Sequence, residues 1–323
     1  MTATVEIPLE KYSGAVREIT LGATREQGGT RNHTVTIGGA KALPFLHFEG
    51  AVPHAPALAI EIQDRAPSDW SPLLMQTWGN VVENPAQWAQ AAEARGADVL
   101  LLKFNTTQAD GTLNNAANAR SVTRAVLNAS GLPLIVFGPG QAEIDNELLV
   151  AAAEEAKGER VVLGVCEDKN YRTIVAAAMA NDQLVDSRTP MDVNLSKQLV
   201  ILIHDMGMPL DRIIMDPSTG ALGYGIEYGY SVMERLRLAA LQGDTMTQSP
   251  MLVTVGEEAW RVKEAKVGEG VPETWGDWQE RAILWETLTA SALVESGADV
   301  IVMRHPEAVA RVKKMINELM SNQ

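Results

Sequence analysis

From residue 57 onward, a short apolar run is followed by a stretch with helical spacing of apolar residues, and this unit recurs eight times. The runs that we expect to form strands are 57–62, 99–104, 134–137, 161–165, 183–185, 213–215, 252–255 and 300–302. The expected helices are 86–95, 118–129, 143–156, 171–181, 194–206, 228–241, 278–296 and 306–320. Short apolar runs that alternate with helices are typical of parallel strands covered by helices.

Eight such units in about 270 residues match the size of a (β/α)8 TIM barrel, an α/β fold. The alternative is an open doubly wound sheet, which usually shows a glycine fingerprint after its first strand. Here the first run continues into Gln63-Asp64-Arg65-Ala66-Pro67, without that fingerprint. Two further runs, 16–22 and 34–38, predict an antiparallel β-hairpin packed on the N-terminal end of the barrel. We therefore divide the chain into an N-terminal extension with the β-hairpin (1–53) and the barrel (54–323).

Composition excludes several classes of protein. The formal net charge of −14 makes nucleic acid an unfavourable partner, because the phosphate backbone is also negative. No apolar run reaches about 18 residues, so we expect no membrane span. The N-terminus lacks the pattern of a signal peptide. The single cysteine, Cys166, cannot hold an iron–sulfur cluster alone. We expect a cytoplasmic protein.

In barrels of this kind the functional groups lie on the loops at the C-terminal ends of the strands. The longest glycine-rich loop follows the sixth strand, where Asp216-Pro217 ends the apolar run. Its glycines offer bare backbone to a flat or bulky ligand. A match to a dinucleotide fingerprint in this loop is weak, since it follows the sixth strand rather than the first. From their positions at strand ends, the candidate cofactor-binding residues are Asp216, Ser218, Gly223, Tyr224, Gly225, Arg304 and His305.

No residue is assigned an acid–base or metal-ligating role. The five histidines show no short zinc-ligand spacing. We interpret Cys166 as a buried residue that behaves as a small apolar side chain, because no partner base is visible in the sequence. Arg237 belongs to what we interpret as a solvated helix face. The chain therefore looks non-catalytic by itself.

Three stretches resemble a known family. They are 21–31 (Leu-Gly-Ala-Thr-Arg-Glu-Gln-Gly-Gly-Thr-Arg) with His33, the segment from Asp216-Pro-Ser to Glu227-Tyr, and 255–261 (Val-Gly-Glu-Glu-Ala-Trp-Arg) with Trp285-Glu and Met303-Arg-His-Pro-Glu-Ala-Val. Together they resemble the small, delta-type subunit of the bacterial corrinoid/iron–sulfur protein of the carbon monoxide dehydrogenase/acetyl-CoA synthase system. The resemblance runs from about residue 17 to the C-terminus.

The resemblance implies a (β/α)8 barrel paired with a large subunit, which carries a [4Fe–4S] cluster and most of the cobamide-binding domain. It implies that the barrel mouth faces the corrin of a cobamide shared by the two subunits. The pair would take a methyl group from methyltetrahydrofolate through a separate methyltransferase. It would deliver that group to acetyl-CoA synthase in the reductive acetyl-CoA (Wood–Ljungdahl) pathway of carbon fixation.

Two other interpretations remain open. The first is a self-sufficient, pterin-binding methyltransferase barrel, whose acidic and amide groups would be Asp64, Asn105, Asp186 and Asp216. The second is a structural partner that only stabilises the large subunit. Cobalt content separates the interpretations, because a carrier pair retains cobalt and a pterin enzyme binds a folate alone.

Overall fold

The computed structural model describes residues 8–321 of the chain. Its main sheet has eight parallel strands in the order β8-β7-β6-β5-β4-β3-β10-β9. The strands are β3 (Ala57–Gln63), β4 (Val99–Lys103), β5 (Leu134–Phe137), β6 (Val162–Cys166), β7 (Leu184–Arg188), β8 (Ile213–Asp216), β9 (Leu252–Val253) and β10 (Val300–Met303). A parallel bridge between Met215 and Met251 joins the two ends of this order. The sheet is therefore a nearly closed barrel. The predicted barrel is confirmed, and the open doubly wound sheet is wrong.

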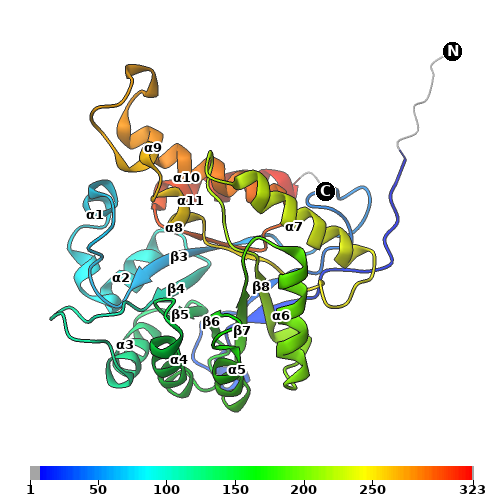
Figure 1. Cartoon of the computed structure of the whole chain (residues 1–323), viewed down its shortest axis with the longest axis horizontal. Coiled ribbons are helices and arrows are strands. Elements are labelled where there is room, and N and C mark those ends of the chain that lie inside the picture. The colour runs from blue at the N-terminus through cyan, green and yellow to red at the C-terminus, as the bar shows by residue number, and fades with distance from the viewer. Residues whose placement is uncertain (1–7, 322–323) are drawn as a thin grey trace.

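Helices cover the outside of the strands (Figure 1). The predicted ones are α2 (Pro85–Ala94), α3 (Ala116–Ala129), α4 (Ala142–Glu155), α5 (Tyr171–Ala180), α6 (Val193–Asp205), α7 (Ile226–Leu241), α10 (Trp278–Glu295) and α11 (Pro306–Ser321). Side chains of Asn84, Asn115, Asp192 and Asp277 cap the first turns of α2, α3, α6 and α10. Within residues 8–321, no helix combines the length and the apolar character needed to cross a bilayer.

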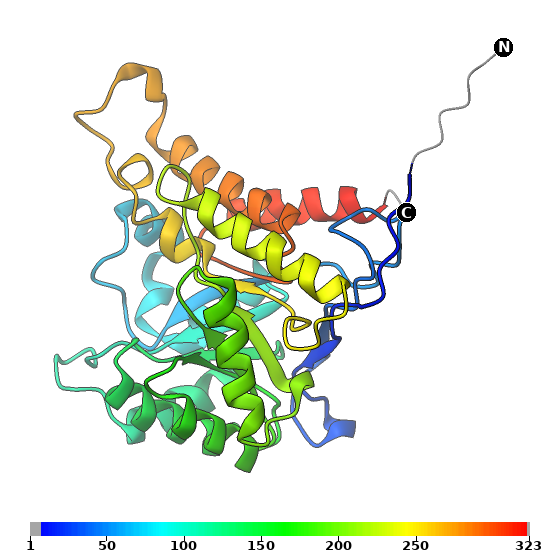
Figure 2. The ribbon, with the colours of Figure 1, turned by 45° about the vertical axis from the view of Figure 1, so that its right-hand side comes forward.

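Three shorter helices lie where the sequence analysis placed no helix: α1 (Pro72–Trp78), α8 (Val255–Ala259) and α9 (Lys263–Lys266). The predicted strand at 252–255 ends earlier, at Val253, because the chain turns directly into α8. The segment between α9 and α10 extends away from the body in both views (Figures 1 and 2).

The N-terminal hairpin consists of β1 (Ile19–Leu21) and β2 (Val35–Ile37), paired antiparallel. Ile19, Leu21 and Ile37 are buried in the same apolar cluster as the first inward-facing residues of the barrel strands. The hairpin therefore closes the N-terminal end of the barrel, as the sequence predicts. In Figure 2 it lies at the opposite end of the molecule from the segment between α9 and α10. Residues 1–7 of the predicted extension lie outside the described residues.

The interior of the barrel changes character from one end to the other. Inward positions recur at every second residue of a strand. Near the hairpin they are apolar: Ala57, Ala59, Val99, Leu101, Ile135, Val162, Leu184, Ile214, Leu252, Val300 and Val302. Two residues further along the same strands they become charged: Glu61, Lys103, Asp186, Asp216 and Arg304. The apolar end supplies the core, and the charged end forms the mouth.

Candidate functional site at the barrel mouth

Three ion pairs form the floor of the mouth. The pairs are Glu61 with Arg304, Lys103 with Glu257, and Arg188 with Asp216. The first is bidentate: the Arg304 Nε and Nη2 atoms lie 2.8 and 2.9 Å from the two carboxylate oxygens of Glu61. The Nζ of Lys103 lies 2.8 Å from Glu257 on α8. Because the ions are paired inside the barrel, the floor is polar and its charges are largely compensated.

Burial and neighbouring charges shift the pKa values of the carboxyl groups in and below the floor. Burial disfavours the charged form of Glu257, but Lys103 and Arg304 outweigh burial and lower the pKa of its carboxyl to about 2. Burial raises the pKa of Asp186 well above its usual range, and the neighbouring charge of Asp216 raises it further. Both carboxyl oxygens of Asp186 are buried and lack hydrogen-bond partners among residues 8–321. Burial and the neighbouring Asp216 therefore both favour the protonated form of Asp186 below the floor.

Arg188 lies at the boundary between the floor and the solvent. Its Nε donates to Asp216 Oδ2 at 2.6 Å, and its guanidinium lies 5.1 Å from the centre of the Phe137 ring. Its Nη2 atom is buried, yet it has no hydrogen-bond partner in the described part of the chain. The side chain is 19% exposed. A ligand would therefore meet this guanidinium at Nη1, which is not among the buried atoms and makes no hydrogen bond within residues 8–321, and not at Nη2.

The rim of the mouth is apolar. Exposed large apolar side chains lie on or next to the loops after three strands: Leu113 after β4, Met191 and Leu195 after β7, and Tyr224 and Tyr228 after β8. Tyr224 and Tyr228 are 57% and 66% exposed, which is high for aromatic residues of a folded chain. An apolar rim around a charged floor is typical of a binding surface.

The glycine-rich loop after β8 forms part of this rim. Gly223 and Gly225 have φ angles of 71° and 105°, which L-residues rarely adopt. A side chain at Gly223 would meet open space, and one at Gly225 would reach only ordinary contact with Tyr228 and Met191. Ser218 also has a positive φ, and its Oγ donates to the carbonyl of Thr189 in the neighbouring loop at 2.6 Å. The loop is thus fixed to the β7–α6 connection and open to solvent at its tip.

Of the seven candidate residues, five lie together on this side of the mouth: Asp216, Ser218, Gly223, Tyr224 and Gly225. Arg304 points into the floor, where Glu61 occupies its guanidinium. His305 does not face the mouth. Its Nε2 lies 3.1 Å from Thr77 Oγ1, and its Nδ1 accepts from the backbone N–H of Glu307.

His305 belongs instead to a buried polar cluster behind the barrel wall. Its ring stacks on Trp260 with 5.9 Å between centroids, and burial lowers its pKa to about 4. The carboxyl of Glu286 accepts from the backbone N–H groups of Arg304 and His305 and from Trp260 Nε1. Burial raises the pKa of Glu286 to about 7 in spite of these donors. This cluster fixes the end of β10 and leaves His305 no free nitrogen.

Glu61 and Lys103 were not predicted as site residues, because both lie inside runs that were assigned to strands. The signal was present: Glu61 follows Ala57 and Ala59 at the inward period of two, as Lys103 follows Val99 and Leu101. A charged residue in that register must enter the barrel. Cys166 is buried as predicted, and burial raises the pKa of its thiol well above the usual range.

The fold and the mouth define a (β/α)8 barrel built for binding, in which the charged groups of the floor are engaged with one another. No cluster of metal-ligating side chains occurs among the described residues. Residues 18–318 match the family described as the CO dehydrogenase/acetyl-CoA synthase delta subunit, and the chain belongs to this family.

Relatives with curated names agree with this assignment. The chain is 39% identical over 320 residues to the acetyl-CoA decarbonylase/synthase complex subunit delta of Archaeoglobus fulgidus, covering 96% of this chain and 70% of that protein. It is 37% identical over 298 residues to the corresponding subunit of Methanopyrus kandleri, covering 92% and 73%. The resemblance drawn from the sequence is confirmed.

Solved structures of similar fold include dihydropteroate synthases. The enzyme of Xanthomonas albilineans superposes with a TM-score of 0.55 at 16% identity, covering 83% of this chain and 93% of that one. The enzyme of Coxiella burnetii, in complex with pteroic acid, gives 0.54 at 15% identity, covering 87% and 99%. At this identity the likeness establishes the barrel fold alone.

Proposed function

We propose that the chain is the small subunit of a two-subunit, cobamide-dependent methyl carrier of the acetyl-CoA pathway. A large subunit holds the [4Fe–4S] cluster and shares the cobamide with this barrel. The pair takes a methyl group from methyltetrahydrofolate, through a methyltransferase, and delivers it to carbon monoxide dehydrogenase/acetyl-CoA synthase. Family membership over residues 18–318 supports this role.

One observation favours the carrier over a self-sufficient pterin enzyme: two of the three carboxyls that would hold a pterin, Asp64 and Asp216, are already engaged. Asp64 accepts from the backbone N–H and Nδ2 of Asn105 and from Nδ2 of Asn114, at 2.7–3.0 Å. Asp216 is paired with Arg188, and Asp186 is fully buried. Asp64 and Asp216 are therefore not free to receive the N–H groups of a pterin ring, and Asp186, although it has no hydrogen-bond partner among residues 8–321, has no exposed surface for one to reach.

The residues at the mouth fit a corrin. A corrin is a flat macrocycle with apolar faces and with carboxamide side chains at its edge. The exposed rim residues Tyr224, Tyr228 and Met191 supply apolar surface, and Arg188 supplies an unpartnered donor. When bound, the cobamide supplies a cobalt centre that accepts and releases the methyl group. This chain's part is to cover one face of the ring, orient it and exclude water.

Within this role the candidate residues divide into two groups. We assign direct contact to Gly223, Tyr224 and Gly225, which form the exposed tip of the β8–α7 loop. Asp216 and Ser218 lie beneath and hold Arg188 and the loop in place. Arg304 stabilises the floor through Glu61, and His305 fixes the wall behind it.

The test is cobamide binding with and without the large subunit. We expect the isolated chain to bind methylcobalamin weakly by calorimetric titration, because one barrel mouth covers only one face of the corrin. The co-expressed pair should retain cobalt and show the ultraviolet–visible spectrum of a protein-bound corrinoid.

Each rival interpretation predicts a different result. Tight binding of methyltetrahydrofolate by the isolated chain, with no cobalt in the pair, would support the pterin enzyme instead. Equal cobalt retention and equal methyl transfer by the large subunit alone would reduce this chain to a structural partner.

A further inference from the structure

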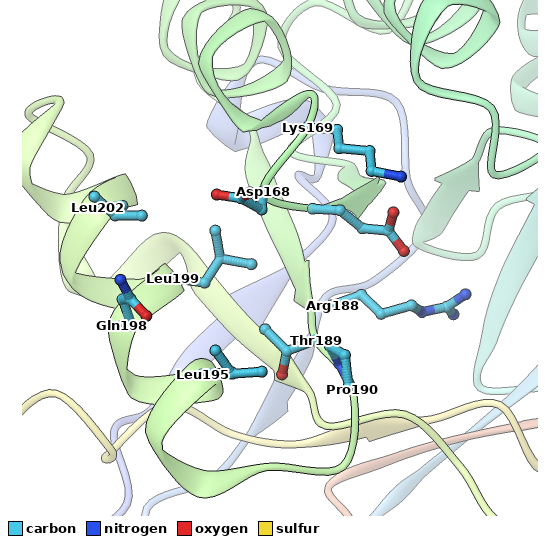
Figure 3. A pocket seen from close by; sticks show the side chains of 10 residues that line it. Asp168, Lys169, Arg188, Thr189, Pro190, Leu195, Gln198, Leu199 and Leu202 are labelled. Atoms are coloured by element: carbon cyan, nitrogen blue, oxygen red, sulfur yellow. The ribbon is translucent and has the colours of Figure 1, made fainter.

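A pocket of about 480 Å³ opens beside the mouth, between the loops after β6 and β7 and the helix α6. Its α6 wall carries Leu195, Leu199, Leu202 and Gln198. Figure 3 shows the side chains of Lys169 and Arg188 on the other side of the pocket, extending away from α6. The pocket thus has an apolar wall and a polar edge, and the polar edge adjoins the floor of the mouth.

Arg188 supplies the polar group that points to a ligand. Its Nε is used by Asp216, its Nη2 is buried without a partner, and its Nη1 makes no hydrogen bond within residues 8–321. Because Nη1 is not buried, it is the unpaired donor that an acceptor oxygen of a ligand can reach. The guanidinium cannot turn away freely, since Asp216 and the Phe137 ring hold it.

The charges around the pocket indicate a neutral acceptor. Lys169 and Arg188 are balanced by Glu167 and Asp168, which line the same pocket. Asp216 adds a further carboxylate next to Arg188. An anionic ligand would approach these three carboxylates, whereas a carboxamide oxygen meets the donor without that repulsion.

We propose that Arg188 donates a hydrogen bond to a peripheral carboxamide oxygen of the corrin, and that Leu195 and Leu199 contact the apolar part of the same edge. This inference rests on the proposed function. It adds that the edge of the corrin is bound on the side of the mouth formed by the end of β7 and by α6. It makes Arg188 a binding residue for the cofactor.

The neighbouring loops hold Arg188 in position. Asp216 accepts from its Nε, and the backbone carbonyl of Asp216 accepts from the N–H of Thr189. Ser218 Oγ donates to the carbonyl of Thr189. The ends of β7 and β8 are therefore tied together directly beside the guanidinium, so that its free edge keeps one orientation.

The experiment uses the cobamide-free pair with the large subunit. Methylcobalamin is titrated into the wild type, Arg188→Lys, and the matched control Arg120→Lys. Arg120 is an arginine on α3 that pairs with Glu154 away from the mouth. Lysine keeps the charge beside Asp216 but loses the guanidinium fork. We expect Arg188→Lys to weaken binding about tenfold or more and Arg120→Lys to leave the Kd unchanged.

A second measurement does not depend on the variant's affinity alone. The titrations are repeated with methylcobalamin derivatives in which one side-chain carboxamide is hydrolysed to a carboxylate. In the wild-type pair, the derivative hydrolysed at the carboxamide that Arg188 contacts should differ from methylcobalamin more than about threefold in Kd, and this ratio should change in Arg188→Lys while the ratios of the other derivatives do not. Circular dichroism and gel filtration control for folding and pairing.

Several outcomes would overturn the inference. A Kd for Arg188→Lys within about twofold of the wild type, or Kd ratios of derivative to methylcobalamin that are all the same in this variant as in the wild type, would remove Arg188 from the cofactor site. Binding of methyltetrahydrofolate that depends on Arg188 would show that the pocket binds the methyl donor and not the corrin. Failure of the wild-type pair to retain any cobamide would refute the proposed function itself, which is a distinguishable result.

Discussion

Arg31 fixes the hairpin to the barrel, and its removal tests whether this end of the molecule is a stability element separate from the mouth. Its side chain is 2% exposed. Its Nε donates to Glu159 at 2.9 Å. The remaining guanidinium donors bond to the carbonyls of Ser130, Leu132 and Leu127 and to Thr30 Oγ1. Arg31, in the connection between β1 and β2, thus bonds both to the segment that leads into β5 and to the segment that leads into β6.

Replacement of Arg31 by methionine should remove all of these bonds and leave Glu159 without its cation. Glu159 keeps one donor, the backbone N–H of Thr30, but its side chain is only 9% exposed. Breaking a buried pair by removing one partner costs about 3–5 kcal/mol. For a domain of this size that corresponds to a fall in melting temperature of roughly 2 °C per kcal/mol, or about 6–10 °C.

Urea denaturation followed by circular dichroism measures this loss. Arg25→Met is the matched control, because Arg25 is an exposed arginine of the same connection. The double variant Arg31→Met/Glu159→Gln should recover part of the loss, since no carboxylate is then left unpaired. A loss below about 1 kcal/mol for Arg31→Met, or equal losses for Arg31→Met and Arg25→Met, would refute the reasoning. Cobamide affinity of the folded variant pair should not change, because the hairpin lies at the far end of the barrel.

Two further predictions concern the other end of the barrel. His305 is neutral in the folded chain, with a pKa of about 4 against about 6.5 when unfolded, so its contribution is present above pH 6.5 and is lost as the pH falls to 4. The stability difference between wild type and His305→Gln should therefore shrink by roughly 3 kcal/mol over that range; parallel curves would contradict it. Gly225→Val, at a φ of 105°, should leave the pair folded but slow methylation of Co(I) by the methyltransferase. Gly96→Val, at a φ of 91° and away from the mouth, is its control; equal rates in both variant pairs would remove the β8–α7 loop from the site.

The barrel could be predicted from the sequence because its strands are buried on both faces. Such strands appear as continuous apolar runs, and the eight runs found in this way are the eight strands of the barrel. The hairpin could be predicted from the alternation at 34–37. Helix α1 was missed because Pro72–Trp78 is too short for periodicity to separate it from a loop.

The mouth was harder to predict because a strand-end residue can point inward or outward. Arg304 and His305 are adjacent in sequence, so the alternation of a strand sends them to opposite faces of the wall. Arg237 shows the same difficulty on a helix. It was interpreted as part of a solvated face, but it is buried and bonds to Gly297 and Asp299 in the connection between α10 and β10. A long side chain can cross from a polar flank of a helix to a buried acceptor, which periodicity does not reveal.

The division of the barrel interior explains how a barrel with no acid–base residue assigned can serve a methyl transfer. The apolar half, closed by the hairpin, supplies the burial that holds the chain together. The charged half adds little net stability, because each ion of a buried pair loses its hydration. What the pairs provide is a fixed floor: Glu257 stays ionised beside Lys103, and Arg188 is held by Asp216 with part of its side chain exposed. A surface of this kind positions a reactive cofactor and leaves the chemistry to it, which is the role that a subunit of a methyl carrier requires.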